Sequence, residues 1–308
     1  MTTGYFTHRD CALHDMGAFH PESPQRLMAI EDALLASGVD VALDRREAPL
    51  ATAEQLLRAH DASHVQRMAQ LAALERDYIA LDPDTILARH SYHAALRAAG
   101  ACVAAVDAVM AGELRNAFCA VRPPGHHATR AQPMGFCFFN SIAVAARHAM
   151  AAHAVQRVLL VDFDVHHGNG TEDILAGDER ALMVSFFQHP FYPYSGADSA
   201  AANLCNLPVP AYTRGPAIRE LIEQRWLPRI AAFAPELVLI SAGFDAHRDD
   251  DLGQLGLVEA DYVWITQQLM QVADASAHGR IVSTLEGGYN LQALARSVVA
   301  HVRTLAGV

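Results

Sequence analysis

Residues 159–170 read Leu-Leu-Val-Asp-Phe-Asp-Val-His-His-Gly-Asn-Gly, and this stretch decides the fold. The apolar run at its start predicts a strand that is buried on both faces. Asp162, Asp164 and His166 follow at spacings of two, so in an extended chain their side chains share one face. Placing two carboxylates and an imidazole at the end of a buried strand costs desolvation free energy unless a counter-charge neutralises them. A divalent metal ion is the counter-charge that fits.

More strands and helices of the same kind alternate along the chain. Apolar strand-like runs occupy residues 117–121, 157–162, 181–186, 236–241 and 280–285. Helical patterns occupy residues 23–36, 91–111, 141–153, 216–233 and 258–275, and a shorter helix starts at Thr52. Strands joined through helices run parallel, with helices on both faces. The sequence therefore predicts an α/β fold, a three-layer sandwich with a central, mostly parallel sheet, in a single domain over residues 1–308.

Two helix starts carry recognisable signals. Ser23 and Pro24 are typical of an N-cap followed by the first helical residue. Thr52 and Gln55 have the spacing of a capping box.

Composition excludes several classes of function. The net charge of −11 argues against a nucleic-acid partner, because phosphate binding needs clustered Lys and Arg. No apolar run approaches the roughly 18 residues that span a bilayer, and the start lacks the apolar segment of a signal peptide, so we expect no membrane and a cytoplasmic location. The 5 cysteines are odd in number and form no C-x-x-C, which indicates neither a disulfide framework nor a thiolate zinc site.

Polar residues follow four of the strand-like runs. These four loops span residues 122–127, 163–169, 242–247 and 286–289. In open α/β sheets, ligands bind outside the carboxyl ends of the strands. We therefore expect the four loops to meet along one edge of the sheet and to form the functional site there.

Asp164, His166 and Asp245 are the candidate metal ligands. They offer two oxygens and one nitrogen, and three protein ligands with an open position are typical of a catalytic zinc site. Fe²⁺, Co²⁺ or Mn²⁺ suits the same ligands. The alternative is a cluster of ion pairs at the strand ends, which would be the better interpretation of an isolated Asp-x-His.

His126 and His127 follow a stiff Pro-Pro-Gly turn. A neutral imidazole beside the metal can take a proton from the attacking water and deliver it to a leaving amine. Asp162 and Asn169 are candidate partners for the far ring nitrogens, and the histidine backed by the carboxylate should stay cationic to higher pH. The alternative is a pair of exposed loop histidines.

Aromatic residues complete the candidate site. Tyr289 follows two glycines, and its phenol can stabilise a developing oxyanion, although a packing tyrosine is an equal alternative. The loops 135–139 and 191–193 carry aromatic rings that either wall an apolar slot or belong to the ordinary core.

These motifs, taken together and in this order, resemble the zinc-dependent histone deacetylase family. The resemblance rests on His20–Arg26, Arg122–Ala128, Gly135–Asn140, Val161–Gly170, Ser241–Asp245 and Glu286–Tyr289. It implies an arginase/deacetylase-like fold with about eight strands and the hydrolysis of an N-acyl amide on a lysine-like amine. Asn169, where class I members carry aspartate, resembles the class II branch and its bacterial relatives.

The resemblance also implies roles for the catalytic residues. The zinc ligands would be Asp164, His166 and Asp245. The remaining catalytic set would comprise His127 as general base and acid, His126 paired with Asp162, Asn169 orienting His127, and Tyr289 polarising the acyl carbonyl.

Substrate and cation sites follow from the same resemblance. The lysine tunnel would be lined by Gly135, Phe136, Tyr192 and Gly288, with Tyr192 replacing a more usual phenylalanine. Asp84, or else Asp82, would hold the substrate backbone at the rim, and Arg26 would line an internal cavity. A structural K⁺ would bind backbone oxygens near Asp162, Asp164, His166, Ser185 and Phe186.

The sequence is compatible with three functions. The first is removal of acetyl groups from lysine side chains of proteins or peptides. The second is deacetylation of small acetylated amines such as acetylpolyamines, and the third is a catalytically weak acyl-lysine binder. A binuclear manganese ureohydrolase is disfavoured, because Gly168 and His247 stand where that branch needs additional aspartates. A homo-oligomer is compatible with the sequence.

Overall fold

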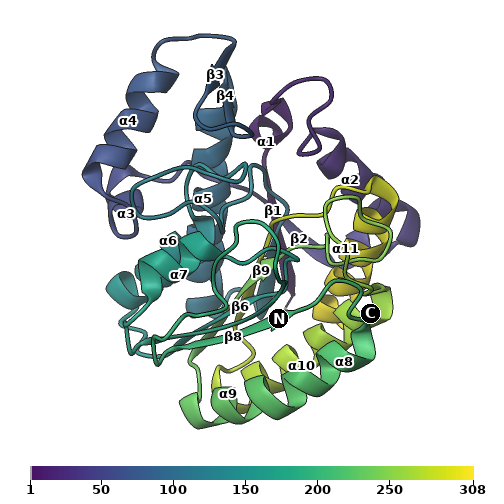
Figure 1. Cartoon of the computed structure of the whole chain (residues 1–308). Coiled ribbons are helices and arrows are strands. Elements are labelled where there is room, and N and C mark those ends of the chain that lie inside the picture. The colour runs from purple at the N-terminus through teal and green to yellow at the C-terminus, as the bar shows by residue number, and fades with distance from the viewer. Residues whose placement is uncertain (1) are drawn as a thin grey trace.

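The computed structural model describes residues 2–308 and places one eight-stranded sheet at the centre of the molecule (Figure 1). The strand order is β2-β1-β5-β10-β9-β6-β7-β8, and every neighbouring pair is parallel. The strands are β1 (Thr3–Thr7), β2 (Leu43–Glu47), β5 (Asn116–Cys119), β6 (Val158–Asp162), β7 (Ala181–Gln188), β8 (Leu204–Val209), β9 (Leu237–Ala242) and β10 (Ile281–Leu285). The predicted α/β sandwich is confirmed.

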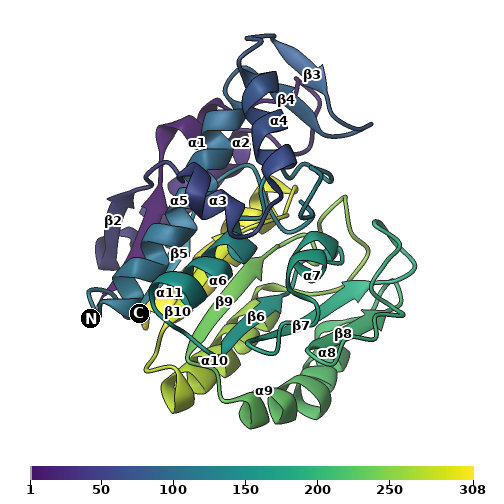
Figure 2. The ribbon, with the colours of Figure 1, turned by 90° about the vertical axis from the view of Figure 1, so that its left-hand side faces the viewer.

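Helices cover both faces of this sheet (Figure 2). Helices α5 and α6 pack on β5 and β9 from one side, and α11 and α10 pack on the same strands from the other. The helices are α1 (Arg9–Leu13), α2 (Gln25–Ser37), α3 (Ala53–Leu57), α4 (Ala62–Ala72), α5 (Ser91–Met110), α6 (Ser141–Ala152), α7 (Asn169–Leu175), α8 (Gly215–Leu221), α9 (Leu227–Phe233), α10 (Glu259–Ser276) and α11 (Leu291–Ala306). A small hairpin of β3 (Tyr78–Ala80) and β4 (Ile86–Ala88) projects beside α4 at one end of the molecule (Figures 1 and 2).

The central strands are buried along their whole length, as their apolar sequences predict. Every residue of β6, β7, β9 and β10 is buried. Burial of a side chain such as Leu159 or Leu160 contributes roughly 1.5–3 kcal/mol. This rigid base holds the polar loops that follow the strands.

Two predicted helices differ from the observed ones. Helix α2 begins at Gln25, and the predicted N-cap interaction of Ser23 is absent; Pro24 holds the cap position without a side-chain hydrogen bond. The predicted helix 216–233 is divided by a π-helical turn at Ile222–Trp226. Pro228 lies at the start of α9 and has no N–H to bond the preceding turn, so the helix widens there. The capping box of Thr52 and Gln55 is confirmed.

Helix α5 contradicts the expectation that no segment is long and apolar enough to span a membrane. It has 20 residues and passes that test by length and composition alone. However, 67% of its most apolar window is buried inside the protein. The helix is therefore explained as a core helix packed on the sheet.

The strand order brings the polar loops together. The four strands that precede these loops, β5, β10, β9 and β6, are adjacent in the middle of the sheet. Because the strands are parallel, their carboxyl ends lie at the same edge. The predicted meeting of the four loops is confirmed.

Candidate active site

Asp164, His166 and Asp245 converge at the carboxyl ends of β6 and β9. Nδ1 of His166 lies 3.0 Å from Oδ1 of Asp164 and 3.3 Å from Oδ2 of Asp245. The other oxygen of Asp245 accepts the backbone N–H of Val165 at 2.9 Å, which ties the two loops together. The structure thus brings all three predicted ligands to one point, and each offers one ligand atom within 4.8 Å of the others.

The chemistry of these three residues fits a divalent ion. Oδ2 of Asp245 is buried, and apart from its contact with His166 it has no hydrogen-bond partner among the described residues. Burial and repulsion from Asp164 raise the pKa of Asp245 to about 7. Burial alone would lower the pKa of His166, but hydrogen bonds and charge from the two carboxylates raise it to about 10. The two carboxylates thus favour a positive charge at His166, and a bound divalent ion would supply that charge instead.

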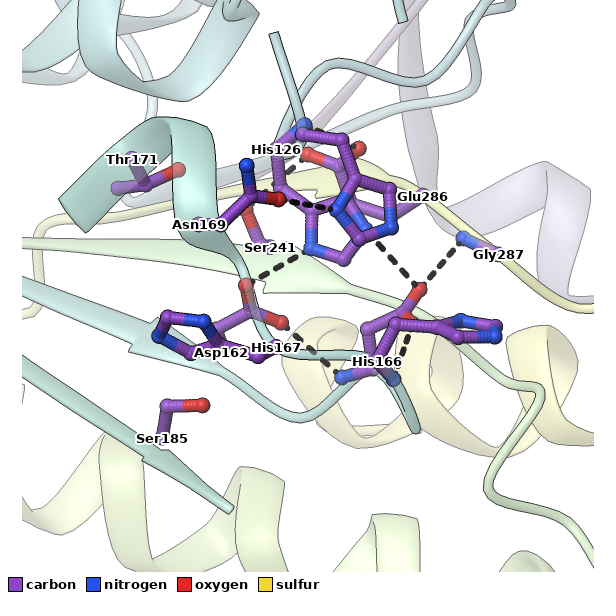
Figure 3. Close-up of polar contacts among 12 residues, drawn as sticks. His126, Asp162, His166, His167, Asn169, Thr171, Ser185, Ser241, Glu286 and Gly287 are labelled. Atoms are coloured by element: carbon purple, nitrogen blue, oxygen red, sulfur yellow. Dashed lines mark hydrogen bonds and ion pairs between the residues drawn. The ribbon is translucent and has the colours of Figure 1, made fainter. Parts of the chain in front are cut away.

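A glycine leaves the space around these ligands open. A Cβ on Gly287 would lie 1.9 Å from Oδ2 of Asp245 and 2.6 Å from Oδ2 of Asp164. The backbone N–H of Gly287 donates to the same Asp164 oxygen at 2.9 Å (Figure 3). Only glycine allows the 286–289 loop to approach the carboxylates this closely.

The rings of His126 and His127 lie against each other, and each has its own partner; Figure 3 shows His126 directed at Asp162. Their ring centroids are 4.0 Å apart. Nδ1 of His126 lies 2.9 Å from Oδ2 of Asp162, and Nδ1 of His127 lies 2.7 Å from Oδ1 of Asn169. The pairing inferred from the resemblance is the one that the structure has.

The surroundings of the two rings give them different protonation states. Burial lowers the pKa of His126, but Asp164 and Asp162 outweigh burial and raise it well above its ordinary value. Burial and the positive charges of His126 and His166 hold the pKa of His127 well below its ordinary value. His126 is therefore a cation at neutral pH, and His127 is a neutral imidazole that can accept a proton.

Glu286 belongs to the site, although the sequence predicts no role for it beyond its place in the 286–289 motif. Its Oε2 accepts the backbone N–H of Gly125 at 2.6 Å and of His126 at 3.1 Å. Its Oε1 accepts the hydroxyl of Ser241 at 3.0 Å. Burial raises the pKa of this carboxyl to about 7. Glu286 therefore fixes the backbone that carries the histidine pair.

A pocket of about 290 Å³ opens above the metal ligands and the histidines. It is lined by Asp84, His127, Gly135, Phe136, His166, Phe191, Tyr192, Asp251, Leu252 and Tyr289. Gly135 lies so close to His127 that a Cβ would be 2.5 Å from its ring. Phe136 has a φ of 69°, which is rare outside glycine, and the Thr85 hydroxyl accepts its N–H at 3.0 Å. The strained backbone turns the Phe136 ring into the pocket wall.

Three of the four predicted tunnel residues, Gly135, Phe136 and Tyr192, line this pocket. Tyr192 lies edge-to-face on His127, with centroids 5.2 Å apart. Phe191, one of the aromatic residues expected either to wall an apolar slot or to belong to the core, lines the pocket and stacks on His166 at a centroid distance of 5.4 Å. Gly288 is not among the lining residues of this pocket; instead its carbonyl accepts a 2.6 Å hydrogen bond from the buried Arg26.

Asp84, rather than Asp82, faces the pocket at its rim. Asp82 is engaged with the backbone, since its Oδ1 accepts the N–H groups of Asp84 and Thr85. Burial and the neighbouring Asp82 raise the pKa of Asp84 to about 6.

Tyr289 lines the pocket, and burial raises the pKa of its phenol well above the ordinary value. The hydroxyl therefore remains a hydrogen-bond donor. Asp250 positions it and is a second residue that the sequence analysis missed. Oδ2 of Asp250 accepts the N–H groups of Tyr289 at 2.6 Å and Asn290 at 2.9 Å, and Oδ1 accepts that of Leu252 at 3.0 Å. Its place in a run of three aspartates gave no signal, because only the fold distinguishes the buried one.

The residues named for a structural cation lie at the carboxyl end of β6, in the loop that follows it, and on the adjacent strand β7. Ser185 of β7 is the register partner of Asp162 of β6 (Figure 3), and Phe186 is the next residue of β7. Ser185, Phe186 and Asp162 are all buried.

Comparisons with known proteins agree with this geometry. A family model described as the histone deacetylase domain matches residues 20–305. The crystal structure of the HDA15 HD domain superposes with a TM-score of 0.94 at 34% identity, covering 100% of this chain and 90% of that one.

Two curated relatives differ in what their names describe. The histone deacetylase-like amidohydrolase of Pseudomonas aeruginosa is 37% identical over 298 residues, covering 94% of this chain and 78% of that protein. The polyamine deacetylase HDAC10 of Mus musculus is 38% identical over 308 residues, covering 93% of this chain but 45% of that protein. With a matching domain model, a matching fold and relatives above 30% identity, the chain belongs to the histone deacetylase family, a family of amide-bond hydrolases.

Proposed function

We propose that this protein is a zinc-dependent amidohydrolase that removes acetyl groups from lysine side chains of proteins or peptides. One observation carries the proposal: Asp164, His166 and Asp245 meet beneath a pocket that also presents a neutral His127 and the phenol of Tyr289. These are the groups that hydrolysis of an unactivated amide requires.

The ion would be held by Asp164, His166 and Asp245. When bound, it would supply Lewis-acid polarisation of the acyl carbonyl and make water a better nucleophile at neutral pH. Zn²⁺ suits the mixed nitrogen and oxygen ligands, and Fe²⁺ and Co²⁺ are alternatives.

The protein's own groups perform the proton transfers. Neutral His127 accepts a proton from the attacking water at Nε2, because Asn169 holds its Nδ1. The hydroxyl of Tyr289 donates a hydrogen bond to the acyl oxygen as negative charge develops there. The proton held by the imidazole then moves to the departing amine. The cationic His126, fixed by Asp162, adds positive charge beside the developing oxyanion.

The pocket wall suits a substrate with a methylene chain. Phe136, Tyr192 and Leu252 give the passage apolar surface above the reacting groups. Asp84 at the rim offers a carboxylate to a backbone N–H or to a cationic group of the substrate.

Metal analysis and kinetics on an acetyl-lysine peptide test the proposal. Asp164→Asn should lose the ion and the activity, and a chelator should abolish hydrolysis until Zn²⁺ is restored. Asp249→Asn is the matched control, because Asp249 lies on the surface and pairs with Arg296. Unchanged hydrolysis in Asp164→Asn or after chelation would exclude the mechanism, and tight binding of an acetylated peptide without turnover would favour a binding protein.

A second candidate is the deacetylation of small acetylated amines. Asp84 and Asp251 both line the pocket and could hold a distal ammonium group, and one relative is named a polyamine deacetylase. Side-by-side kcat/KM values on an acetyl-lysine peptide and on acetylputrescine decide between the two substrates.

We also propose a structural K⁺ at the β6–β7 end, bound by backbone oxygens near Asp162, Asp164, His166, Ser185 and Phe186. The support is the family resemblance together with the burial and pairing of these strand ends. A melting temperature that rises in KCl but not in an equal concentration of choline chloride would agree with this site.

A further inference from the structure

Two histidines and one aspartate form a cluster on the surface of α5 and α6, outside the pocket described above. Asp107 lies near the end of α5, His148 lies on α6, and His153 follows α6 directly. Nε2 of His148 and Nε2 of His153 each lie 2.6 Å from the same Oδ1 of Asp107. We propose that this Asp107–His148–His153 cluster is a second site for a divalent transition-metal ion such as Zn²⁺.

The ligand atoms have the right chemistry and the right reach. Two imidazole nitrogens and one carboxylate oxygen suit Zn²⁺, Co²⁺ and Ni²⁺, and here they lie within 4.8 Å of one another. The present 2.6 Å separations are hydrogen bonds, so an ion about 2.0–2.2 Å from each atom needs them to move apart by a fraction of an ångström. This movement falls on the side chain of His153, which is partly exposed at the C-cap of α6.

Exposure leaves the cluster accessible to a hydrated ion. The side chain of Asp107 is 51% exposed and that of His153 is 25% exposed, whereas His148 is nearly buried. The open side leaves room for water to complete the coordination. Partial burial would raise the pKa of Asp107, but hydrogen bonds from His153 and His148 lower it, so the ligand is a carboxylate at neutral pH.

Arg58 competes with the ion. Its Nη1 lies 2.6 Å from Nδ1 of His148, and a guanidinium can only donate. Nδ1 of His148 is therefore the acceptor, and Nε2 carries the proton when no ion is bound. Ligation at Nε2 moves the proton to Nδ1 and releases Arg58, which stays paired with Glu54 at 2.9 Å. This competition predicts a moderate affinity, with a Kd on the order of micromolar.

The ion would join two helices that pack on the same face of the sheet. The cluster lies at the end of α6 opposite Asn140, whose side chain caps the helix and donates to the carbonyls of His126 and Ala128. The helix has 12 residues and is about 18 Å long, with His148 roughly two turns from Asn140 and His153 just past the far end. We therefore expect the ion to raise stability and to leave the hydrolytic rate unchanged.

Calorimetric titration of Zn²⁺ into enzyme already loaded with its catalytic ion tests the site. The expected result is one further ion per chain and a melting temperature higher by a few degrees. Asp107→Asn and His153→Ala should lose the second ion while keeping the catalytic ion and the rate. His90→Ala removes an exposed histidine at the other end of α5 and should change nothing.

Arg58→Gln provides the sharper test, because it removes the competitor without touching a ligand. The affinity of the second ion should rise about tenfold. The proposal is overturned if the loaded enzyme takes up no second ion at millimolar Zn²⁺, or if Asp107→Asn and His153→Ala both bind it as wild type does. Because the readout is binding to the loaded enzyme, the result does not depend on which acyl substrate the enzyme hydrolyses.

Discussion

Asp250 offers a direct test of how the fold places the phenol of Tyr289. Its buried carboxylate links two loops of the site, the one that carries Asp245 and Leu252 and the one that carries Tyr289. The substitution Asp250→Asn keeps the shape of the side chain but replaces one acceptor oxygen by an NH₂ group. One of the backbone N–H donors must then face another donor.

The expected cost in stability follows from these contacts. A hydrogen bond to a charged group contributes about 1.5–3 kcal/mol, and an unpaired buried donor adds a further penalty. Burial raises the pKa of Asp250 while its backbone N–H partners lower it, so neutralising the side chain returns part of the desolvation cost. We expect Asp250→Asn to lower the free energy of unfolding by about 2 kcal/mol.

The expected loss of kcat in Asp250→Asn is larger than this change in the free energy of unfolding suggests. Displacement of a catalytic group by about 1 Å can cost on the order of 100-fold in rate. Loss of a whole oxyanion donor costs about 100- to 1000-fold, which sets the upper limit. We expect kcat to fall roughly 10- to 100-fold with KM nearly unchanged, because the phenol acts mainly in the transition state.

Kinetics on an acetyl-lysine peptide, with metal content and circular dichroism as checks, measure this effect. Asp249→Asn is the matched control: it makes the same charge change on the adjacent, surface-exposed residue and should cost little. In the Asp250→Asn/Tyr289→Phe double variant, the losses should not multiply, because both changes remove the same interaction. The reasoning is refuted if Asp250→Asn is as active as Asp249→Asn, or if the two losses multiply.

Three further predictions concern the ligands, the base and the core. Gly287→Ala would place a methyl group 1.9 Å from a carboxylate oxygen of Asp245, so we expect a folded protein with little bound metal and little activity. Asn169→Asp would put a carboxylate behind His127 and raise the pKa of that imidazole, so the acid limb of the kcat/KM profile should move to higher pH. Burial lowers the pKa of His301 to about 3, so between that value and the unfolded-state pKa of about 6.5 the unfolded chain binds more protons. Stability is therefore lost as pH falls below about 6.5, by up to about 1.4 kcal/mol per pH unit, and His301→Asn should remove this part of the slope in denaturant titrations.

Each of these predictions has a result that contradicts it. Full metal content in Gly287→Ala would show that the loop has room to move. Gly256→Ala is its control, because a Cβ there meets the Arg214 side chain at 3.0 Å and backbone atoms only at 3.5 Å or more. An unmoved acid limb in Asn169→Asp would mean that another group limits the rate at low pH. An unchanged slope in His301→Asn would assign the acid sensitivity to other buried histidines such as His60, whose pKa burial also lowers to about 3.

The sequence alone determined the strands of the sheet centre and the chemistry at their ends. Continuous apolar runs identify β5, β6, β7, β9 and β10, because such runs are stable only when both faces are covered. The sequence does not predict the edge strands β2 and β8, and their composition gives the physical reason. β2 reads Leu-Asp-Arg-Arg-Glu, and β8 contains Pro208, and both features belong to edges rather than to buried strands.

Only the tertiary structure decided which of the polar residues act together. Asp245 lies 80 residues from Val165, whose N–H it accepts, and no local pattern encodes that contact. The same holds for Glu286 beneath the histidine loop and for Asp250 behind Tyr289. A periodic pattern reports which face of an element is buried, but the partners across the sheet edge depend on the order of the strands. That order is set by packing of the whole chain, and it alone distinguishes Asp250 from the aspartates on either side of it.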